Sequence, residues 1–184
     1  MGLFQRFRRN DRGVAALEFA IVAPMILILY MGASQLSIGV TLDRKLQNIA
    51  ATTTDLVSQS QGGTTTKGEI SAILKIARAM VEPYDSADVK IRLMSVSVDA
   101  KGKATVDWTP VTAGGATAPK KGDVYALPAA FSAQRSRSFV IAEVEYTYKP
   151  LGGFGLQNAL PLKEASYQTP RTTDPSSGIV CSDC

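Results

Sequence analysis

The sequence of 184 residues contains no histidine and only two cysteines. Without histidine the chain cannot build a Ser-His-Asp or Cys-His nucleophilic centre, and it lacks the commonest metal ligand of proteins. The sequence also has no P-loop and no glycine-rich dinucleotide fingerprint. We therefore expect a protein that is not an enzyme and that has no cofactor and no metal site.

Charged residues are scarce over one long stretch near the N-terminus. After Arg12, the next thirty residues carry a single charged side chain, that of Glu18. A spanning helix needs about 20 mostly apolar residues, so this run is long enough to cross a bilayer. We expect residues 14–40 to form a transmembrane helix. Because a charge inside a membrane costs on the order of a few kcal/mol, Glu18 is a candidate functional residue.

Basic residues are concentrated ahead of this apolar run. The net charge of the chain is +4, and residues 1–13 contribute +3 of it, with four arginines and one aspartate. Basic residues beside a membrane segment are retained in the cytoplasm. We expect residues 1–13 to be a cytoplasmic leader and the residues after about Val40 to lie on the outer side of the membrane. The arginines are not interleaved with aromatic residues on a folded face, so we expect no nucleic-acid partner.

The leader has three interpretations. It can be an uncleaved cytoplasmic tail, or a peptide removed after Gly13 that leaves Val14 as the new N-terminus. It can also belong to a conventional signal peptide, cut near the small residues Gly32 and Ser34. Two features disfavour this third interpretation. Glu18 would lie inside the apolar core of the signal, and the helical pattern continues beyond the cut.

The continuation past Val40 is amphipathic. Apolar residues recur at helical spacing on one face, and polar residues occupy the other faces. We expect residues 41–61 to extend the transmembrane helix, which would run from Val14 to about Ser60 and end at Gln61–Gly63. Pro24 would loosen or kink its membrane part. The apolar face consists of Leu42, Leu46, Ile49, Ala50, Leu56 and Val57, and the polar faces carry Asp43, Lys45, Gln47, Asn48 and Asp55.

Residues 62–170 have the pattern of an α+β head outside the membrane. Thr66 and Glu69 stand at capping-box spacing before a short apolar-faced helix. Alternating patterns then predict an antiparallel sheet of three to four strands, at Ala87–Val98, Lys103–Trp108, Phe139–Lys149 and Leu162–Thr169. We expect a turn at Gly102, a loop over Thr109–Asp123, and solvated carboxylates at Glu143 and Glu145. Residues 124–137 are ambiguous.

Both cysteines lie in residues 171–184, which we expect to be a polar tail. Cys181 and Cys184 form a C-x-x-C motif. A redox site of this type needs a helix N-terminus in a thioredoxin-like unit, and a Pro/Ser/Gly-rich stretch precedes this motif instead. In an oxidising compartment, the expectation is a local disulfide or a loose tail.

One resemblance brings these features together. Arg12, Gly13, the AALEFA segment around Glu18 and the Ala23-Pro24 pair before an aliphatic run resemble the TadE-like family of minor pilins, or pseudopilins, of the tight-adherence (Tad/Flp) branch of type IV pilus systems. The resemblance covers about the first quarter of the chain. Phe19 stands where the small major pilins of this branch usually have tyrosine, and this chain is far longer. Both departures favour an accessory subunit over the main filament protein.

The resemblance implies a pilin-like fold and a route to assembly. A prepilin peptidase would cut a class III signal peptide between Gly13 and Val14. Glu18 and Phe19 would then act in recognition and assembly with other pilus subunits and with the inner-membrane assembly platform. Such a subunit crosses the inner membrane once, with residues 62–170 as a periplasmic head, and can enter an extracellular pilus used in adhesion. The second hypothesis is an uncleaved, membrane-anchored envelope domain that binds a protein or ligand.

Overall fold

The computed structural model describes residues 12–184, except 109, 132, 151–157, 173–175 and 177. Most of the expected leader therefore lies outside the described residues. The chain divides into two compact units. One unit comprises residues 1–40 with 149–159, and the other comprises residues 41–148 with 160–184.

A single helix, α2, runs from Arg12 to Ser58 with Pro24 inside it. The prediction of one long helix is confirmed. The segment after the helix contains a 3-10 turn, η1, at Gln61–Gly63, where Gly62 has a φ of 65°. Glycine adopts this left-handed conformation without the steric penalty that a Cβ brings, so the glycine pair suits the end of the helix.

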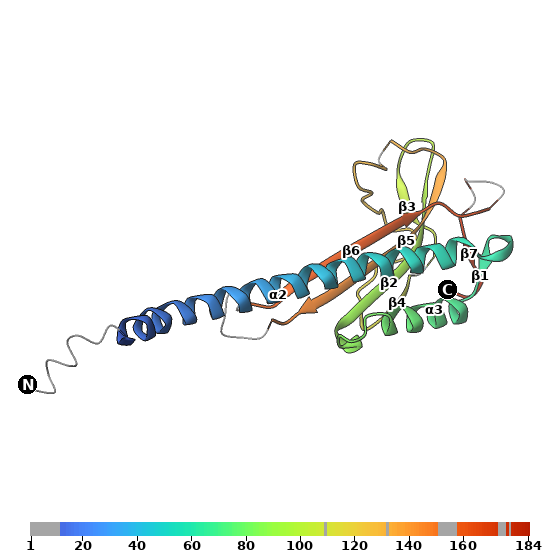
Figure 1. Ribbon diagram of the computed structural model, residues 1–184. Helices are drawn as coiled ribbons and strands as arrows, with labels where there is room; N and C mark the ends of the chain where they lie inside the picture. The colour runs from blue at the N-terminus through green and yellow to red at the C-terminus, as the bar shows by residue number, and fades with distance from the viewer. Residues whose placement is uncertain (1–11, 109, 132, 151–157, 173–175, 177) are drawn as a thin grey trace, which may run out of the picture. The chain divides into compact units, whose positions relative to one another are not determined.

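The second unit is built on an antiparallel sheet (Figure 1). The order is β3-β2-β5-β6, and β4 also pairs with β2. The α+β class is confirmed, and the sheet has one strand more than the upper expectation, because β4 forms where a loop was expected. The strands are β2 (Val89–Val98), β3 (Ala104–Val106), β4 (Val111–Ala113), β5 (Arg137–Tyr148) and β6 (Leu160–Gln168).

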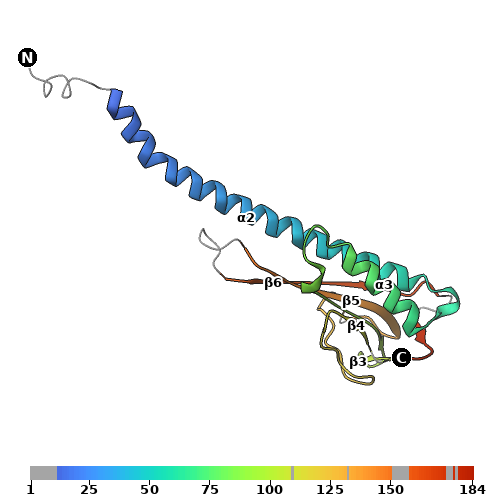
Figure 2. The ribbon, with the colours of Figure 1, turned by 90° about the horizontal axis from the view of Figure 1, so that it is seen from below.

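Two helical segments cover one face of this sheet, as Figure 2 shows for α3 and the C-terminal part of α2. Helix α3 (Lys67–Ala79) begins at the expected capping box, in which Thr66 accepts from the Glu69 amide and Glu69 accepts from the Thr66 amide. A short 3-10 turn, η2 (Ser86–Asp88), leads into β2. The core under the helices includes Leu42, Leu46, Ile49, Ile70, Leu74, Val81, Ile91, Leu93, Ala142 and Val144, all nearly or fully buried.

The opposite face of the sheet has its own apolar cluster. Met94, Val96, Phe139 and Ile141 are buried there, and aromatic and aliphatic side chains from residues 125–131 pack over them. The Phe131 ring lies 5.5 Å from Phe139 and 5.0 Å from Tyr167, measured between centroids. Residues 125–131 of the ambiguous segment therefore form an irregular cover over this face, and the Tyr125 amide donates to the carbonyl of Ala104.

The expected polar tail instead contributes to the fold. Strand β7 (Val180–Cys181) pairs in parallel with β1 (Thr64–Thr65). Ile179 is 1% exposed, and its carbonyl accepts a 2.8 Å hydrogen bond from Trp108 Nε1. One buried isoleucine and one buried indole partner hold a segment whose composition predicts a solvated chain.

Candidate functional site

The candidate processing and assembly residues lie in the first two turns of α2. Gly13 and Val14 are helical, and Glu18 and Phe19 follow one turn later. Positions 14 and 18 are four residues apart and share a helix face. Among the residues that the structure describes, the Glu18 carboxylate has no hydrogen-bond or ion-pair partner, and Phe19 is 73% exposed. The structure thus presents both side chains outward.

Gly13 has no packing role in this structure. A Cβ added at Gly13 would meet no atom within 4 Å, and the same holds at Gly32 and Gly39 further along the helix. Glycine inside a helix costs roughly 0.5–1 kcal/mol relative to alanine. Local packing does not require a glycine at position 13. The reason for a glycine there therefore lies in something other than the packing of this fold.

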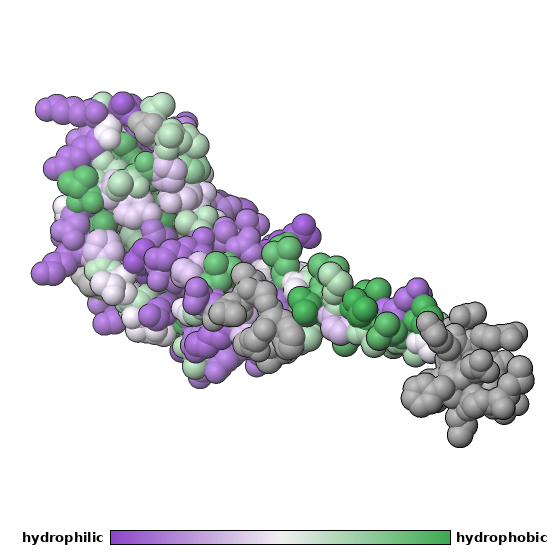
Figure 3. All heavy atoms as spheres, turned by 90° about the vertical axis from the view of Figure 1, so that its left-hand side faces the viewer, coloured by the Kyte–Doolittle hydropathy of each residue, from purple (hydrophilic) through white to green (hydrophobic). Residues whose placement is uncertain are grey.

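The N-terminal part of α2 carries an extended apolar surface. Within the described residues, α2 is the one helix long and apolar enough to cross a membrane, and none of its most apolar stretch is buried. Leu17, Leu29 and Tyr30 are each more than 60% exposed. Figure 3 shows hydrophobic residues, in green, gathered along this part of the helix. Exposed apolar area of this extent marks a membrane or partner surface, so the chain has one segment suited to a bilayer.

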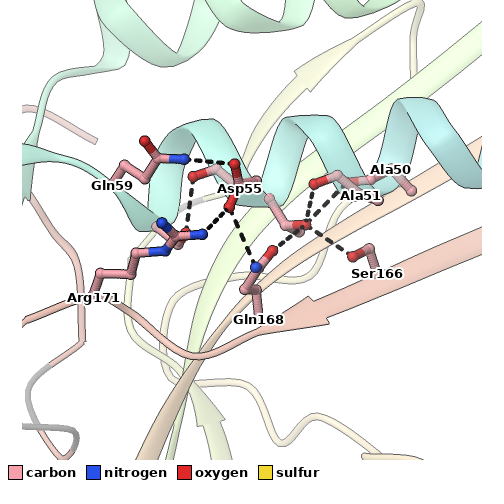
Figure 4. A network of polar contacts seen from close by, with 9 residues as sticks. Ala50, Ala51, Asp55, Gln59, Ser166, Gln168 and Arg171 are labelled. Carbon is pink, nitrogen blue, oxygen red and sulfur yellow. Dashed lines mark hydrogen bonds and ion pairs between the residues drawn. The ribbon is translucent and has the colours of Figure 1, made fainter.

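The C-terminal part of α2 is tied to the sheet by a polar network (Figure 4). Asp55 accepts from Arg171 Nη2 at 2.7 Å, from Gln59 Nε2 at 2.5 Å and from Gln168 Nε2 at 3.4 Å. At the preceding residue, Thr54 Oγ1 lies 2.9 Å from the hydroxyl of Ser166. The polar side of the helix thus contributes anchoring contacts at Asp55.

A carboxyl pair stands at the beginning of this anchored part. Glu164, on β6, is close to Asp43 and Gln47 of α2. Partial burial, followed by the negative charge of Asp43, raises the pKa of Glu164, while a hydrogen bond with Gln47 opposes the rise. Nearby, Lys45 Nζ donates to the carbonyl of Glu82 and lies 5.7 Å from the centroid of the Tyr84 ring. This end of the helix is therefore held by both polar and cation–π contacts.

The expectation of a solvated Glu143 is wrong. Its carboxylate pairs with Arg92 and accepts a hydrogen bond from the Tyr125 hydroxyl, and its side chain is only 15% exposed. Burial and the hydrogen bond to Glu143 raise the pKa of Tyr125 above its ordinary value. Glu145 lies between Arg92 and Lys163, at 3.7 and 3.1 Å. Because each carboxylate faces a cation, the cluster has the character of a structural tie across β2, β5 and β6.

The two cysteines are joined by a disulfide, with Cα atoms 5.5 Å apart. The Sγ atoms and the Asp183 carboxylate lie within 4.8 Å of one another. Because the sulfur atoms are bonded to each other, they are not thiolate ligands for a metal. A pocket of about 270 Å³ lies beside this segment, lined in part by Trp108, Asp107 and Lys121.

The predicted site residues thus form two groups in different compact units: the residues at the start of α2, and the disulfide pair Cys181 and Cys184. Gly13, Val14, Glu18 and Phe19 are neighbours on the first turns of α2, as their spacing requires. The network at Asp55 and the tie at Glu143 were missed. Period-two and helical patterns place both residues on polar faces, and the arginines that pair with them are distant in sequence. Arg92 is 51 positions from Glu143, and Arg171 is 116 positions from Asp55. One feature of the sequence could have indicated that Phe131 packs on the sheet: it is an aromatic residue in a segment rich in small and polar residues.

Comparison with known proteins bears on the first group. Residues 13–54 match the family model described as TadE-like protein. No curated protein and no solved structure matches the chain. The match begins at Gly13, includes Glu18 and Phe19, and ends within the anchored part of α2. The resemblance seen in the sequence is therefore confirmed: residues 13–54 match the TadE-like family model, which is consistent with a protein associated with the Tad pilus.

Proposed function

We propose that this protein is a minor pilin or pseudopilin that takes part in the assembly, priming or tip structure of a Tad-type pilus used in surface adhesion. One observation carries the proposal. The TadE-like match starts at Gly13 and contains Glu18 on an apolar helix that has no covering of its own. In this account the leader is cytoplasmic, α2 crosses the inner membrane once, and residues from Thr41 onward form a periplasmic head.

The lack of packing at Gly13 supports removal of the leader after this residue. A prepilin peptidase must draw the chain out of the helix to reach the bond between Gly13 and Val14. Glycine lowers the cost of this opening, because it is the weakest helix former after proline and has no side chain to clash with the enzyme. Cleavage leaves the α-amino group of Val14 at the start of an apolar helix.

Glu18 then has a partner one turn away. The new amino group at Val14 and the carboxylate at Glu18 have opposite charges, which attract much more strongly in a medium of low dielectric constant than in water. The carboxylate also complements the positive end of the helix dipole. The amine can belong to the same subunit or to a neighbouring one. The second case aligns two helices at a fixed height in the membrane and provides a mechanism for assembly.

The first experiment tests cleavage. The full chain is expressed with the prepilin peptidase of the same pilus system and extracted from membranes for N-terminal sequencing. We expect the sequence to start at Val14. Gly13→Val is expected to leave the leader attached, whereas Gly32→Val is expected to be processed normally. The two glycines are matched, because an added Cβ meets no atom within 4 Å at either position.

The cleavage test also decides between the two hypotheses. An intact leader in the wild-type protein would support the alternative function, an uncleaved membrane-anchored envelope domain with a protein- or ligand-binding role. A start near Gln35 would point to a conventional signal peptide and a soluble mature head. Either result overturns the pilin proposal.

The second experiment tests the role of Glu18 in assembly. In a host that carries the other pilus components, we expect Glu18→Gln to be processed and to reach the membrane but to support few surface fibres. Glu18→Asp retains the charge and is expected to retain part of the function. Fibres are sheared from cells and measured by immunoblot. Wild-type fibre formation and adhesion with Glu18→Gln would remove the basis of the assembly mechanism.

A further inference from the structure

The C-terminal segment of residues 178–184, here named the clasp, touches three separate parts of the second unit. Its strand β7 pairs with β1, the Ser182 amide donates to the Thr65 carbonyl at 3.1 Å, and Asp183 Oδ1 accepts from the Lys67 amide at 2.6 Å. Lys67 is the first residue of α3. A carboxylate at a helix N-terminus satisfies a free amide and complements the helix dipole. The clasp therefore stabilises the start of α3.

The clasp also covers Trp108, the only tryptophan of the chain. Trp108 is 3% exposed, and its indole Nε1 donates to the carbonyl of Ile179. Ile179 is itself buried. Gly178 passes so close to the sheet that an added Cβ would lie 3.0 Å from both Ser95 Oγ and Asp107 Oδ2. The position of Trp108 in a dry environment thus depends on the position of the clasp.

Few contacts hold this segment. Strand β7 has two residues, and Val180 between the buried Ile179 and the disulfide is 59% exposed. Ordering such a segment costs conformational entropy at every residue, which one buried side chain and a few hydrogen bonds offset only narrowly. The clasp is therefore a part of the unit that can open without global unfolding.

The disulfide changes the entropy cost of ordering the clasp. The bond between Cys181 and Cys184 closes a loop that contains Ser182 and Asp183, the two residues that bind Thr65 and Lys67. A closed loop has fewer conformations when it is detached, so less entropy is lost when it docks. Opening the bond restores that freedom to the residues that make the docking contacts. The oxidised clasp is consequently the better-docked one.

We infer that the clasp is a redox-operated closure: the disulfide holds it over Trp108 and on the start of α3, and its reduction releases it. On closing, two cysteine S–H bonds break and one S–S bond forms, and two protons and two electrons pass to the disulfide of an oxidant, which becomes a dithiol. On opening, a dithiol reductant supplies them. Release uncovers the β1 edge and opens the pocket that Trp108, Asp107 and Lys121 line with the clasp.

The single tryptophan makes the inference measurable in the full chain, purified in detergent. Trp108 emission and its quenching by acrylamide are recorded before and after treatment with tris(2-carboxyethyl)phosphine. We expect reduction to shift the emission to longer wavelength and to raise the quenching constant severalfold, with an unchanged far-UV circular dichroism spectrum. Limited carboxypeptidase digestion, followed by mass spectrometry, is expected to remove clasp residues faster after reduction.

Two variants separate the clasp from other effects of the reductant. Cys181→Ser/Cys184→Ser is expected to show the reduced-state signals from the start and no response to the reductant. Gly178→Val keeps both cysteines but cannot lie against Ser95 and Asp107, so it is expected to expose Trp108 even when oxidised. Gly68→Ala, where the nearest atom to an added Cβ is 3.8 Å away, serves as its control.

Two outcomes overturn the inference. If Trp108 quenching and clasp digestion are the same in the oxidised and reduced protein, the disulfide does not control docking. If reduction removes the far-UV signal along with Trp108 protection, the bond supports the whole fold and is no local closure. Neither outcome bears on the cleavage after Gly13, so the pilin proposal is tested independently.

Discussion

The guanidinium of Arg171 lies 2.7 Å from the carboxylate of Asp55, joining the last turn of α2 to the segment that follows β6. The backbone reinforces this pair, because the Arg171 amide donates to the carbonyl of Ser58 at 2.9 Å. The side chains of Arg171 and Asp55 are 59% and 38% exposed. Water therefore screens the ion pair, and the backbone bond beside it does not depend on charge.

This arrangement predicts a small coupling between the two side chains. In a double-mutant cycle of Asp55→Ala and Arg171→Ala, we expect a coupling free energy below about 1 kcal/mol, as for exposed ion pairs. The coupling should fall further in 1 M salt, where the Debye length is about 3 Å. Urea unfolding followed by circular dichroism measures both values. A coupling that is large and insensitive to salt would contradict an exposed, screened pair.

The anchored part of α2 is a core element, and its substitution should have a large effect. Leu46 is fully buried, whereas Leu56 on the same helix is 45% exposed. Leu46→Ala is expected to lower the free energy of unfolding by roughly 2–5 kcal/mol, the range for truncated core leucines. Leu56→Ala is the matched control and should change it by much less. Equal effects would show that the helix does not pack as described.

Short-range patterns in the sequence were sufficient to predict most of the fold. The capping box at Thr66 and Glu69 and the alternation through β2 depend on neighbours a few residues apart, which a sequence displays directly. The same is true of the spacing from Gly13 to Glu18. These features needed no knowledge of tertiary packing.

The elements that were missed depend on distant partners. Glu143 reads as a solvent-facing residue of a half-buried strand, and only the folded sheet brings Arg92 from β2 opposite it. Similarly, the dry position of Ile179 exists because Trp108, 71 residues earlier, offers an indole donor. The polar composition of residues 171–184 predicts a loose tail, but a single buried contact can override composition. Long-range pairing of this kind leaves no periodic signal in one sequence.

The tie between Arg92 and Glu143 gives a prediction with an internal test. Arg92→Met leaves the Glu143 carboxylate, 15% exposed, without its cation and also removes the donor to the Thr117 carbonyl. We expect a loss of about 1.5–3 kcal/mol in the free energy of unfolding, the range for hydrogen bonds to charged groups. Urea unfolding at neutral pH measures it.

The double variant checks the cause of that loss. Arg92→Met/Glu143→Gln replaces the unpaired charge by a neutral amide, whose oxygen can still accept from Tyr125. If the penalty comes from an uncompensated carboxylate, this variant should be more stable than Arg92→Met alone. If the double variant is no more stable than Arg92→Met, the loss of stability comes instead from the lost packing of the aliphatic part of the arginine side chain.

The carboxyl group of Glu164 predicts a dependence of stability on pH. Partial burial and the neighbouring Asp43 raise its pKa above the ordinary 4.5. The folded protein then holds this proton more tightly than the unfolded chain does, so folding gains stability as pH falls through the raised pKa. This gain in stability is complete at pH values below the pKa of Glu164 in the unfolded chain, and it is absent at high pH.

Glu164→Gln removes the pH-dependent contribution of this carboxyl group to stability. We expect the variant to equal or exceed the wild type in stability at pH 7 and to lose that advantage as the pH falls towards 4.5. Other carboxyl groups titrate in the same window, so the measured quantity is the difference between the two proteins in urea unfolding at each pH. Asp43→Asn should reduce the same difference in part. A wild type that gains stability over Glu164→Gln as pH rises would reverse the assigned direction.

A pair of adjacent glycines provides the sharpest test of how β4 meets β2. Gly114 and Gly115 both have a positive φ, of 68° and 72°, so alanine is strained at either position by roughly 1–3 kcal/mol. They differ in their surroundings, because a Cβ at Gly114 would lie 2.0 Å from the carbonyl oxygen of Val89, whereas a Cβ at Gly115 would meet no atom within 4 Å. Gly114→Ala should therefore cost clearly more than Gly115→Ala in urea unfolding, since the end of β4 must move away from β2. Equal costs in the two variants would mean that backbone strain alone acts at this turn and that the close approach to Val89 does not exist in solution.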